Sequence, residues 1–338
     1  LCFAGSRAID YDKRIAGASY LEIAQSGGGI WDSVQKTRRA SEHQLAHLTA
    51  QRANRHLSEG VTTIEVKSGY GLSVAEETKL LQAIAKATQL TKADLIPTCL
   101  AAHILPKDFD GDEKRYLEII SHELLPLLKQ ENLTQRVDIF VEQGAFSYEN
   151  AKRYLLQANL LGFELTVHAD QFSIGGSQLA VELNARSADH LEASKEPQIR
   201  LLAHSNTVAI ALPGASLGLG MAYAPARQLL DNGAILAIAS DWNPGSAPMG
   251  DLLTQAALLS AAEKLTAPET FAALTFRAAH ALGLSDRGKL DKNLLADFQA
   301  YPCDDYREIL YHQGKMKPIS VWKKGERCSF AYNQFMKG

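Results

Sequence analysis

Residues 234–245 of the chain read AILAIASDWNPG, and this stretch decides how the fold is interpreted. Its first six residues are small or apolar and include the β-branched Ile235 and Ile238, which predicts a strand buried on both faces. The strand ends at Asp241, and a Pro-Gly turn follows. A carboxylate at the mouth of a buried strand is costly unless something there needs it. Asp241 is therefore the first candidate functional residue.

A second apolar run has the same form. Residues 163–167 read FELTV and are followed by His168, Asp170 and Gln171. The carboxyl ends of the strands of a parallel barrel meet on one face, and such barrels carry their active sites there. We therefore expect His168 and Asp241 to meet at one rim.

Short apolar strands alternate with helical segments along most of the chain, which predicts parallel βα units and an α/β fold. We expect seven strands, ending near residues 66, 102, 141, 167, 189, 212 and 240. A closed (β/α)8 TIM barrel has eight, so the first strand is expected immediately before Leu1. Residues 8–60 precede the alternation and predict two helical parts separated by Gly27–Gly29, the second running as one helix over about 31–59.

The sequence changes character after the last barrel helices. We expect residues 1–285 to form the barrel and residues 286–338 to form the C-terminal portion of a small β-sandwich module. The N-terminal part of that module is expected upstream of Leu1.

Composition excludes several classes of partner. The chain has 35 basic and 38 acidic residues, so no net field favours nucleic acid or an anionic membrane. No apolar run approaches the roughly 20 residues of a membrane helix. The cysteines are far apart and lack zinc-site spacing, which predicts reduced thiols in a cytoplasmic protein. They are Cys2, Cys99, Cys303 and Cys328.

Polar side chains follow most of the expected strands. A single histidine at a strand end is more often hydrogen-bonded to backbone than catalytic. The repetition at successive buried strands nevertheless favours an active site. The residues concerned are Tyr70, His103, His168, His190 and Asp241.

His168 and Asp241 together predict a metal centre, because neutral imidazole and carboxylate are usual ligands of zinc and ferrous iron. Two ligands are too few, so the expected upstream strand would supply more. The alternative is a His–Asp hydrogen bond that supports the barrel rim. Three further histidines, His43, His47 and His56, are expected on the surface of a long helix, and His43 lacks the glutamate of an HExxH motif.

Several segments in order resemble the amidohydrolase superfamily and, within it, the imidazolonepropionase family. These enzymes open 4-imidazolone-5-propanoate by hydrolysis to N-formimino-L-glutamate in histidine degradation. The resemblance covers essentially the whole chain. The segments are LCFAGSR at 1–7, SYL at 19–21, KSGYG at 67–71, AAH at 101–103, VHADQ at 167–171, ADH at 188–190 and SDWNPGS at 240–246.

The resemblance implies a role for each matching residue. His168 and Asp241 would bind one zinc or iron ion, and Asp241 would also accept a proton from the attacking water. His190 would polarise the ring carbonyl or stabilise the developing oxyanion. Arg7, Tyr70 and His103 would hold the propanoate carboxylate and the ring. The remaining pocket residues would be Tyr20, Gln171, Asn243, Gly245 and Ser246.

Two features depart from the family pattern. The His-x-His metal motif is absent from these residues, and it is expected immediately upstream. Gln171 stands where some relatives carry glutamate, and an amide can orient substrate or water but cannot shuttle protons. Proton transfer would then fall to Asp241 and His190.

Two other functions remain open. One is a deaminase of the same superfamily acting on cytosine or a guanine-like ring, and the other is a catalytically inactive barrel used as a binding module. Arg7, Tyr70 and His103 favour a small carboxylate substrate over a nucleobase. A homodimer is also expected.

Overall fold

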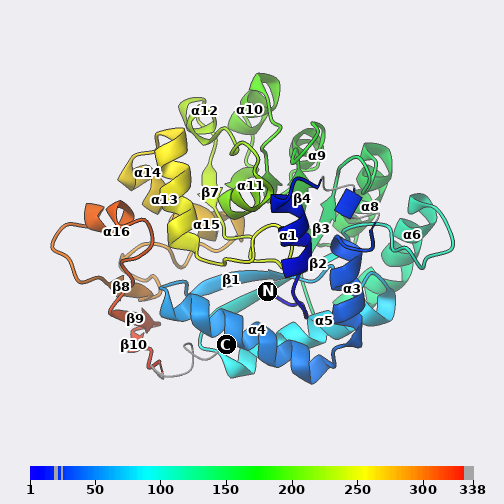
Figure 1. Cartoon of the computed structure of the whole chain (residues 1–338), viewed down its shortest axis with the longest axis horizontal. Helices are drawn as coiled ribbons and strands as arrows, with labels where there is room; N and C mark the ends of the chain where they lie inside the picture. The colour runs from blue at the N-terminus through cyan, green and yellow to red at the C-terminus, as the bar shows by residue number, and fades with distance from the viewer. Residues whose placement is uncertain (19–21, 24–25, 331–338) are drawn as a thin grey trace.

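The computed structural model describes residues 1–18, 22–23 and 26–330, and its centre is a curved parallel sheet (Figure 1). The sheet has seven strands in sequential order, which confirms all seven predicted strands. Within the described residues β1 and β7 each pair with a single neighbour, so an eighth strand stays a prediction. The strands are β1 (Thr63–Lys67), β2 (Asp94–Ala102), β3 (Arg136–Phe140), β4 (Glu164–Ala169), β5 (Ser187–His190), β6 (Val208–Ala211) and β7 (Leu236–Ile238).

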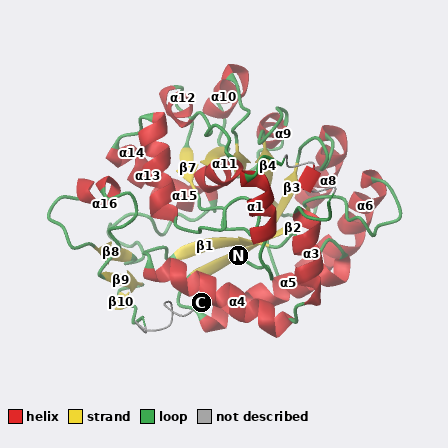
Figure 2. Ribbon diagram, in the orientation of Figure 1, coloured by secondary structure: helices red, strands yellow, loops and turns green. Residues whose placement is uncertain are grey.

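Helices cover the outer face of this sheet (Figure 2). Their apolar faces bury residues such as Leu80, Leu155 and Leu202 against the strands, and burial of each such side chain contributes roughly 1.5–3 kcal/mol. The helices between strands are α5 (Val74–Ala87), η1 (Thr88–Leu90), α6 (Glu113–Ile119), η2 (Ile120–Leu124), α7 (Leu125–Gln130), α8 (Tyr148–Leu160), α9 (Gly176–Glu182), α10 (Glu196–Ala203), α11 (Pro213–Leu219) and α12 (Ala226–Asp231). Helices α13 (Leu252–Glu263), α14 (Ala267–Leu274) and α15 (Phe276–Ala281) follow β7.

The N-terminal helices differ from the prediction of one helix over 31–59. The structure has α3 (Ile30–Arg39) and α4 (Glu42–Ser58), separated by an extended Ser41. Its Oγ accepts the backbone N–H of Gln44 at 3.2 Å, so Ser41 acts as an N-cap that starts a new helix. Ahead of them, α1 (Ala8–Ile15) contacts α11 and the loop that follows β7, because Arg14 donates to the carbonyls of Gly218 and Gly245.

A separate three-stranded antiparallel sheet, ordered β10-β9-β8, forms the C-terminal part (Figure 1). Lys323 joins it to the barrel, since its Nζ lies 2.7 Å from Asp94 Oδ2 at the start of β2. The division at residue 285 stays a prediction. The elements are β8 (Phe298–Ala300), α16 (Arg307–Tyr311), β9 (Ser320–Lys323) and β10 (Glu326–Arg327).

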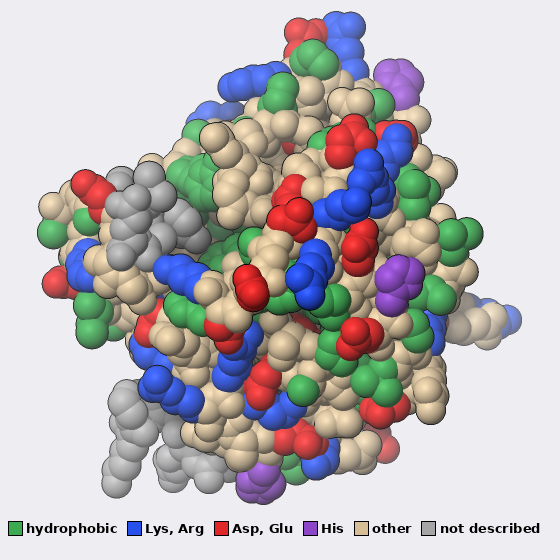
Figure 3. Space-filling view, turned by 90° about the vertical axis from the view of Figure 1, so that its right-hand side faces the viewer, with side chains coloured by type: hydrophobic (Ala, Val, Ile, Leu, Met, Phe, Trp, Pro, Cys, Tyr) green, Lys and Arg blue, Asp and Glu red, His purple; other side chains and the backbone are tan. Residues whose placement is uncertain are grey.

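The surface carries both signs of charge. Basic and acidic side chains are interspersed over the face drawn in Figure 3. None of the helices in the described ranges combines the length and apolar character that a bilayer span requires.

Candidate active site at the carboxyl ends of the strands

One cavity of about 280 Å³ opens at the carboxyl ends of the strands. It brings together every predicted site residue that the structure describes; Tyr20 lies outside the described residues. The predicted residues that line it are Arg7, Tyr70, His103, His168, Gln171, His190, Asp241, Asn243, Gly245 and Ser246.

The backbone turns sharply at the carboxyl ends of the strands, where the predicted site residues lie. Asp170, His190, Leu191 and Asp241 have φ angles of 51°, 89°, 74° and 45°. This left-handed region is unfavourable for residues other than glycine, and such strain concentrates at functional sites.

His168 stands at the end of β4, held between neighbours on both sides. Its ring centroid lies 5.3 Å from that of His190 and 6.3 Å from that of His103. Its Nδ1 lies 2.8 Å from Oδ2 of the fully buried Asp138 on β3. This carboxylate orients the imidazole with Nδ1 toward it and leaves the lone pair of Nε2 available to a metal ion or a hydrogen-bond donor. Sequence reasoning missed Asp138, because its partner depends on the register between strands.

Asp241 follows β7 and its side chain faces the cavity. Burial among protein atoms raises the pKa of its carboxyl, although His190, His168 and Lys67 act in the opposite direction. Asn243 Nδ2 donates to the Asp241 main-chain carbonyl at 2.8 Å and to its Oδ2 at 2.9 Å. A positioned carboxylate with a raised pKa is a better proton acceptor than a free one.

His190 ends β5 and is buried. Burial favours the neutral ring, but Glu192, Asp241 and Asp189 outweigh burial and raise the pKa of His190. Glu192 Oε2 lies 3.5 Å from His190 Nδ1, and Ser216 Oγ donates to Glu192 Oε1 at 2.9 Å. Sequence reasoning missed Glu192, although an acid two residues after a strand-end histidine was visible.

Tyr70 and His103 form one wall, with ring centroids 5.5 Å apart. Burial, followed by the charge of His168, lowers the pKa of His103 to about 4, and its Nδ1 lies 2.9 Å from the Gly69 carbonyl. The buried Glu77 fixes the loop that carries Tyr70. It accepts the backbone N–H groups of Gly69, Gly71 and Leu72 at 3.0, 2.7 and 2.8 Å, and sequence reasoning also missed it.

Arg7 enters the cavity from the N-terminal segment. Its Nε lies 2.8 Å from Asp10 Oδ2, which also accepts the Gly29 N–H at 2.9 Å, so the glycine triplet anchors the arginine. A Cβ at Gly245 would lie 2.2 Å from Arg7 Nη1, so a larger residue there would displace the guanidinium.

The prediction that His56 is a surface residue is wrong. His56 is 2% exposed, its ring packs edge-on to Trp242 with centroids 5.0 Å apart, and its Nε2 lies 3.4 Å from Ser240 Oγ. Burial lowers its pKa to about 3. The helical spacing from Ala46 through Ala53 to His56 places it on the buried face of α4.

The residues present fit a zinc or ferrous ion. His168 and Asp241 offer an imidazole and a carboxylate to the same cavity, and within the described part of the chain no lysine or arginine nitrogen lies within 4.0 Å of the Asp241 carboxylate. Such a donor pair suits these metals. Deeper in the barrel, donor atoms of Asp138, His168 and Asp189 lie within 4.8 Å of one another.

Sequence comparisons identify related proteins. The profile of the Amidohydrolase family matches residues 23–326. An imidazolonepropionase from Myxococcus xanthus is 40% identical over 100% of this chain and 80% of its own length. One from Deinococcus deserti is 43% identical over 96% of this chain and 80% of its own length.

Solved structures share the fold. Atrazine chlorohydrolase TrzN from Arthrobacter aurescens TC1, complexed with zinc, superposes with a TM-score of 0.65 at 15% identity, covering 95% of this chain and 77% of that one. An adenosine deaminase from Xanthomonas campestris with bound zinc gives a TM-score of 0.67 at 18% identity, covering 93% and 75%. Both structures share the α/β fold of this chain, in which helices surround a parallel sheet.

Proposed function

The chain belongs to the imidazolonepropionase family of amidohydrolases, and we propose that it opens the ring of 4-imidazolone-5-propanoate by hydrolysis to N-formimino-L-glutamate in histidine degradation. The observation that carries this proposal is the single cavity lined by His168, His190, Asp241 and Arg7. Together these side chains would supply metal ligands, a proton acceptor, a hydrogen-bond donor and a cation for a substrate carboxylate.

We propose that His168 and Asp241 hold one zinc or iron ion. When bound, the ion would supply Lewis acidity, which activates water and polarises a carbonyl near neutral pH. Asp138 keeps the His168 ring in the orientation that leaves Nε2 available.

Proton transfer is assigned to this chain's own residues. Asp241 would take a proton from the water as the water oxygen adds to the ring carbonyl carbon. The adjacent ring C–N bond would then break as Asp241 passes that proton to the leaving nitrogen. His190, held by Glu192, would donate a hydrogen bond to the carbonyl oxygen as negative charge develops there.

The propanoate group of the substrate would be bound by the polar side chains of Arg7, Tyr70 and His103. Arg7 would pair with the carboxylate through its planar guanidinium, while Tyr70 and His103 would contact the carboxylate and ring. Gln171 would orient substrate or water. Asn243, Gly245, Ser246 and Tyr20 are proposed to complete the pocket.

Turnover of 4-imidazolone-5-propanoate measured beside cytosine tests the function. We expect hydrolysis of the first compound alone, and Arg7→Met should raise its KM at least tenfold because the carboxylate loses its partner. The exposed Arg39→Met is the matched control. Turnover of cytosine would identify the deaminase alternative, and no turnover with no bound metal would identify an inactive barrel.

The cytoplasmic location and homodimeric assembly stay predictions. The lining of the cavity supports one part of the proposal most directly, which is the binding of a small molecule that carries a carboxylate.

A further inference from the structure

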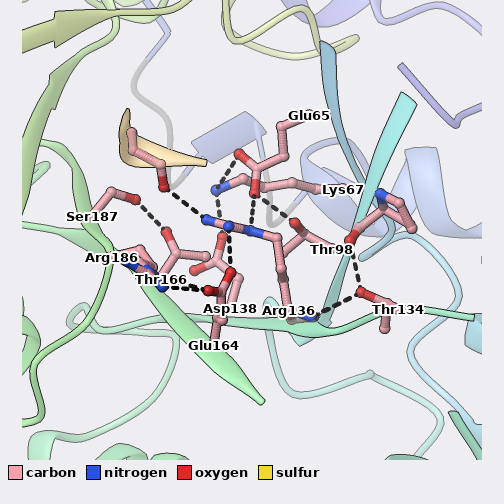
Figure 4. Close-up of polar contacts among 12 residues, drawn as sticks. Glu65, Lys67, Thr98, Thr134, Arg136, Asp138, Glu164, Thr166, Arg186 and Ser187 are labelled. Carbon is pink, nitrogen blue, oxygen red and sulfur yellow. Dashed lines mark hydrogen bonds and ion pairs between the residues drawn. The ribbon is translucent and has the colours of Figure 1, made fainter. Parts of the chain in front are cut away.

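The interior of the barrel below the cavity holds a cluster of charged side chains from β1, β3, β4 and β5 (Figure 4), beside an apolar cluster from β6 and β7. In the lower layer Arg136 lies 2.8 Å from Glu164 and 3.7 Å from Glu65. In the upper layer, directly beneath His168, Lys67 Nζ lies 2.6 Å from Asp138 Oδ2 and 2.5 Å from Asp189 Oδ2. The upper layer therefore places one fixed cation between two buried carboxylates.

The two carboxylates and His168 otherwise form a set of donors suited to a divalent metal. Their ligand atoms lie within 4.8 Å of one another, and carboxylate with imidazole is a donor set that Mn²⁺ and Zn²⁺ accept. Asp138 Oδ1 is buried without a hydrogen-bond partner. That oxygen is an acceptor available to a cation at this position.

We propose that the Lys67 ammonium occupies the position of a second cation and thereby limits the centre to a single metal ion. The proposal rests on the metal-dependent function proposed above. Lys67 pairs with both Asp138 and Asp189 and offsets one of their two charges, so an ammonium rather than a metal fills the space between them, while Asp138 also orients the His168 ring. Lys67 is thus a residue that determines how many ions the site takes.

Charge balance gives the physical reason. Asp138 is fully buried and Asp189 is 3% exposed, and buried carboxylates without a compensating charge are strongly unfavourable. Removing the ammonium leaves two acids facing a space that the lysine side chain has vacated. A divalent cation satisfies both acids and the free oxygen of Asp138.

The proposal is tested by measuring how many metal ions each full-length chain retains after it has been incubated with excess Mn²⁺ and then dialysed. We expect one equivalent in the wild type and two in Lys67→Ala. Lys67→Arg retains the positive charge and should bind one. The double variant Lys67→Ala with Asp189→Asn loses one of the two acids and should also bind one.

Thermal unfolding provides a second readout. Added Mn²⁺ should raise the unfolding temperature of Lys67→Ala more than that of the wild type, because the ion replaces a missing charge. A folded Lys67→Ala protein with one equivalent would overturn the proposal, as would a Lys67→Ala protein that stays unfolded at millimolar Mn²⁺.

A third test uses the wild-type protein alone, by measuring anomalous diffraction from crystals grown with excess Mn²⁺. We expect no peak between Asp138 and Asp189, and a peak there contradicts the role assigned to Lys67. The two proposals fail in different ways. If the proposed hydrolase function is wrong, the wild-type protein binds no metal ion and does not turn over the substrate. If only the role of Lys67 is wrong, the metal content of Lys67→Ala alone differs from the expected value.

Discussion

Asn243 binds Asp241 twice, donating from Nδ2 to the main-chain carbonyl at 2.8 Å and to Oδ2 at 2.9 Å. Its Oδ1 accepts the N–H groups of Gly245 and Ser246 at 2.7 and 2.9 Å. One amide therefore fixes both the acid and the loop beside it.

Replacing Asn243 by alanine should release the Asp241 carboxylate from its orientation. A misplaced catalytic group costs up to about a hundredfold in rate, so we expect a fall of that order in kcat with a smaller change in unfolding temperature. Steady-state kinetics measures the effect. Asn232→Ala, at the exposed end of α12, is the control, and equal kinetics in the two variants would refute the positioning role.

Glu192→Gln should impair His190 without changing the size of the side chain. The amide cannot stabilise a charged imidazole as the carboxylate does, so the pKa of His190 should fall. We expect kcat to decrease by about two orders of magnitude, and the alkaline limb of the kcat/KM profile, where activity falls as His190 loses its proton, should move to lower pH. An unchanged pH profile would show that Glu192 has a structural role only and does not influence the pKa of His190.

Glu77→Gln should loosen the loop that carries Tyr70. The carboxylate accepts three backbone N–H groups, and an amide in its place also directs N–H groups at buried donors. We expect a loss of about 1–3 kcal/mol in the free energy of unfolding and a raised KM. Denaturant titration measures the first quantity, with the exposed Glu118→Gln as the control.

His56 should make the fold sensitive to acid. The folded protein takes up a proton on this ring at about pH 3, whereas the unfolded chain takes it up near pH 6.5. Between these values the unfolded state binds more protons, so stability is fully present above about 6.5 and falls as the pH drops through this window.

His56→Gln should remove the contribution of this ring to the slope of the free energy of unfolding against pH. That contribution is at most about 1.4 kcal/mol per pH unit. Denaturant titrations from pH 7 to 4 measure it, and His204→Gln is the matched surface variant. A His56→Gln protein with the wild-type slope would show that other groups cause the acid sensitivity.

The sequence predicted the strands well because each is a short apolar run bounded by turn residues. His168 and Asp241, which line one cavity, were singled out because they interrupt that pattern. Glu77 and Asp138 were missed because their partners lie on other elements, and pairing depends on strand register and on loop closure.

Local competition explains the remaining differences. The apolar residues over 31–59 have the spacing of one continuous helix. The Ser41 side chain, however, accepts a backbone N–H of the next turn as an N-cap, so one helix ends before Ser41 and another begins after it. The charged side chains at Glu65 and Lys67 alternate with buried Ile64 and Val66. That alternation is typical of a solvent-exposed face, and the sequence does not distinguish solvent from a charged barrel interior.

The most direct test of the central claim is turnover of 4-imidazolone-5-propanoate by metal-free full chain titrated with zinc or ferrous iron. We expect turnover to rise to a limit at one equivalent, and His168→Ala and Asp241→Ala to show neither tight metal binding nor turnover while unfolding cooperatively. Full turnover without metal, or near wild-type turnover in either variant, would contradict the account.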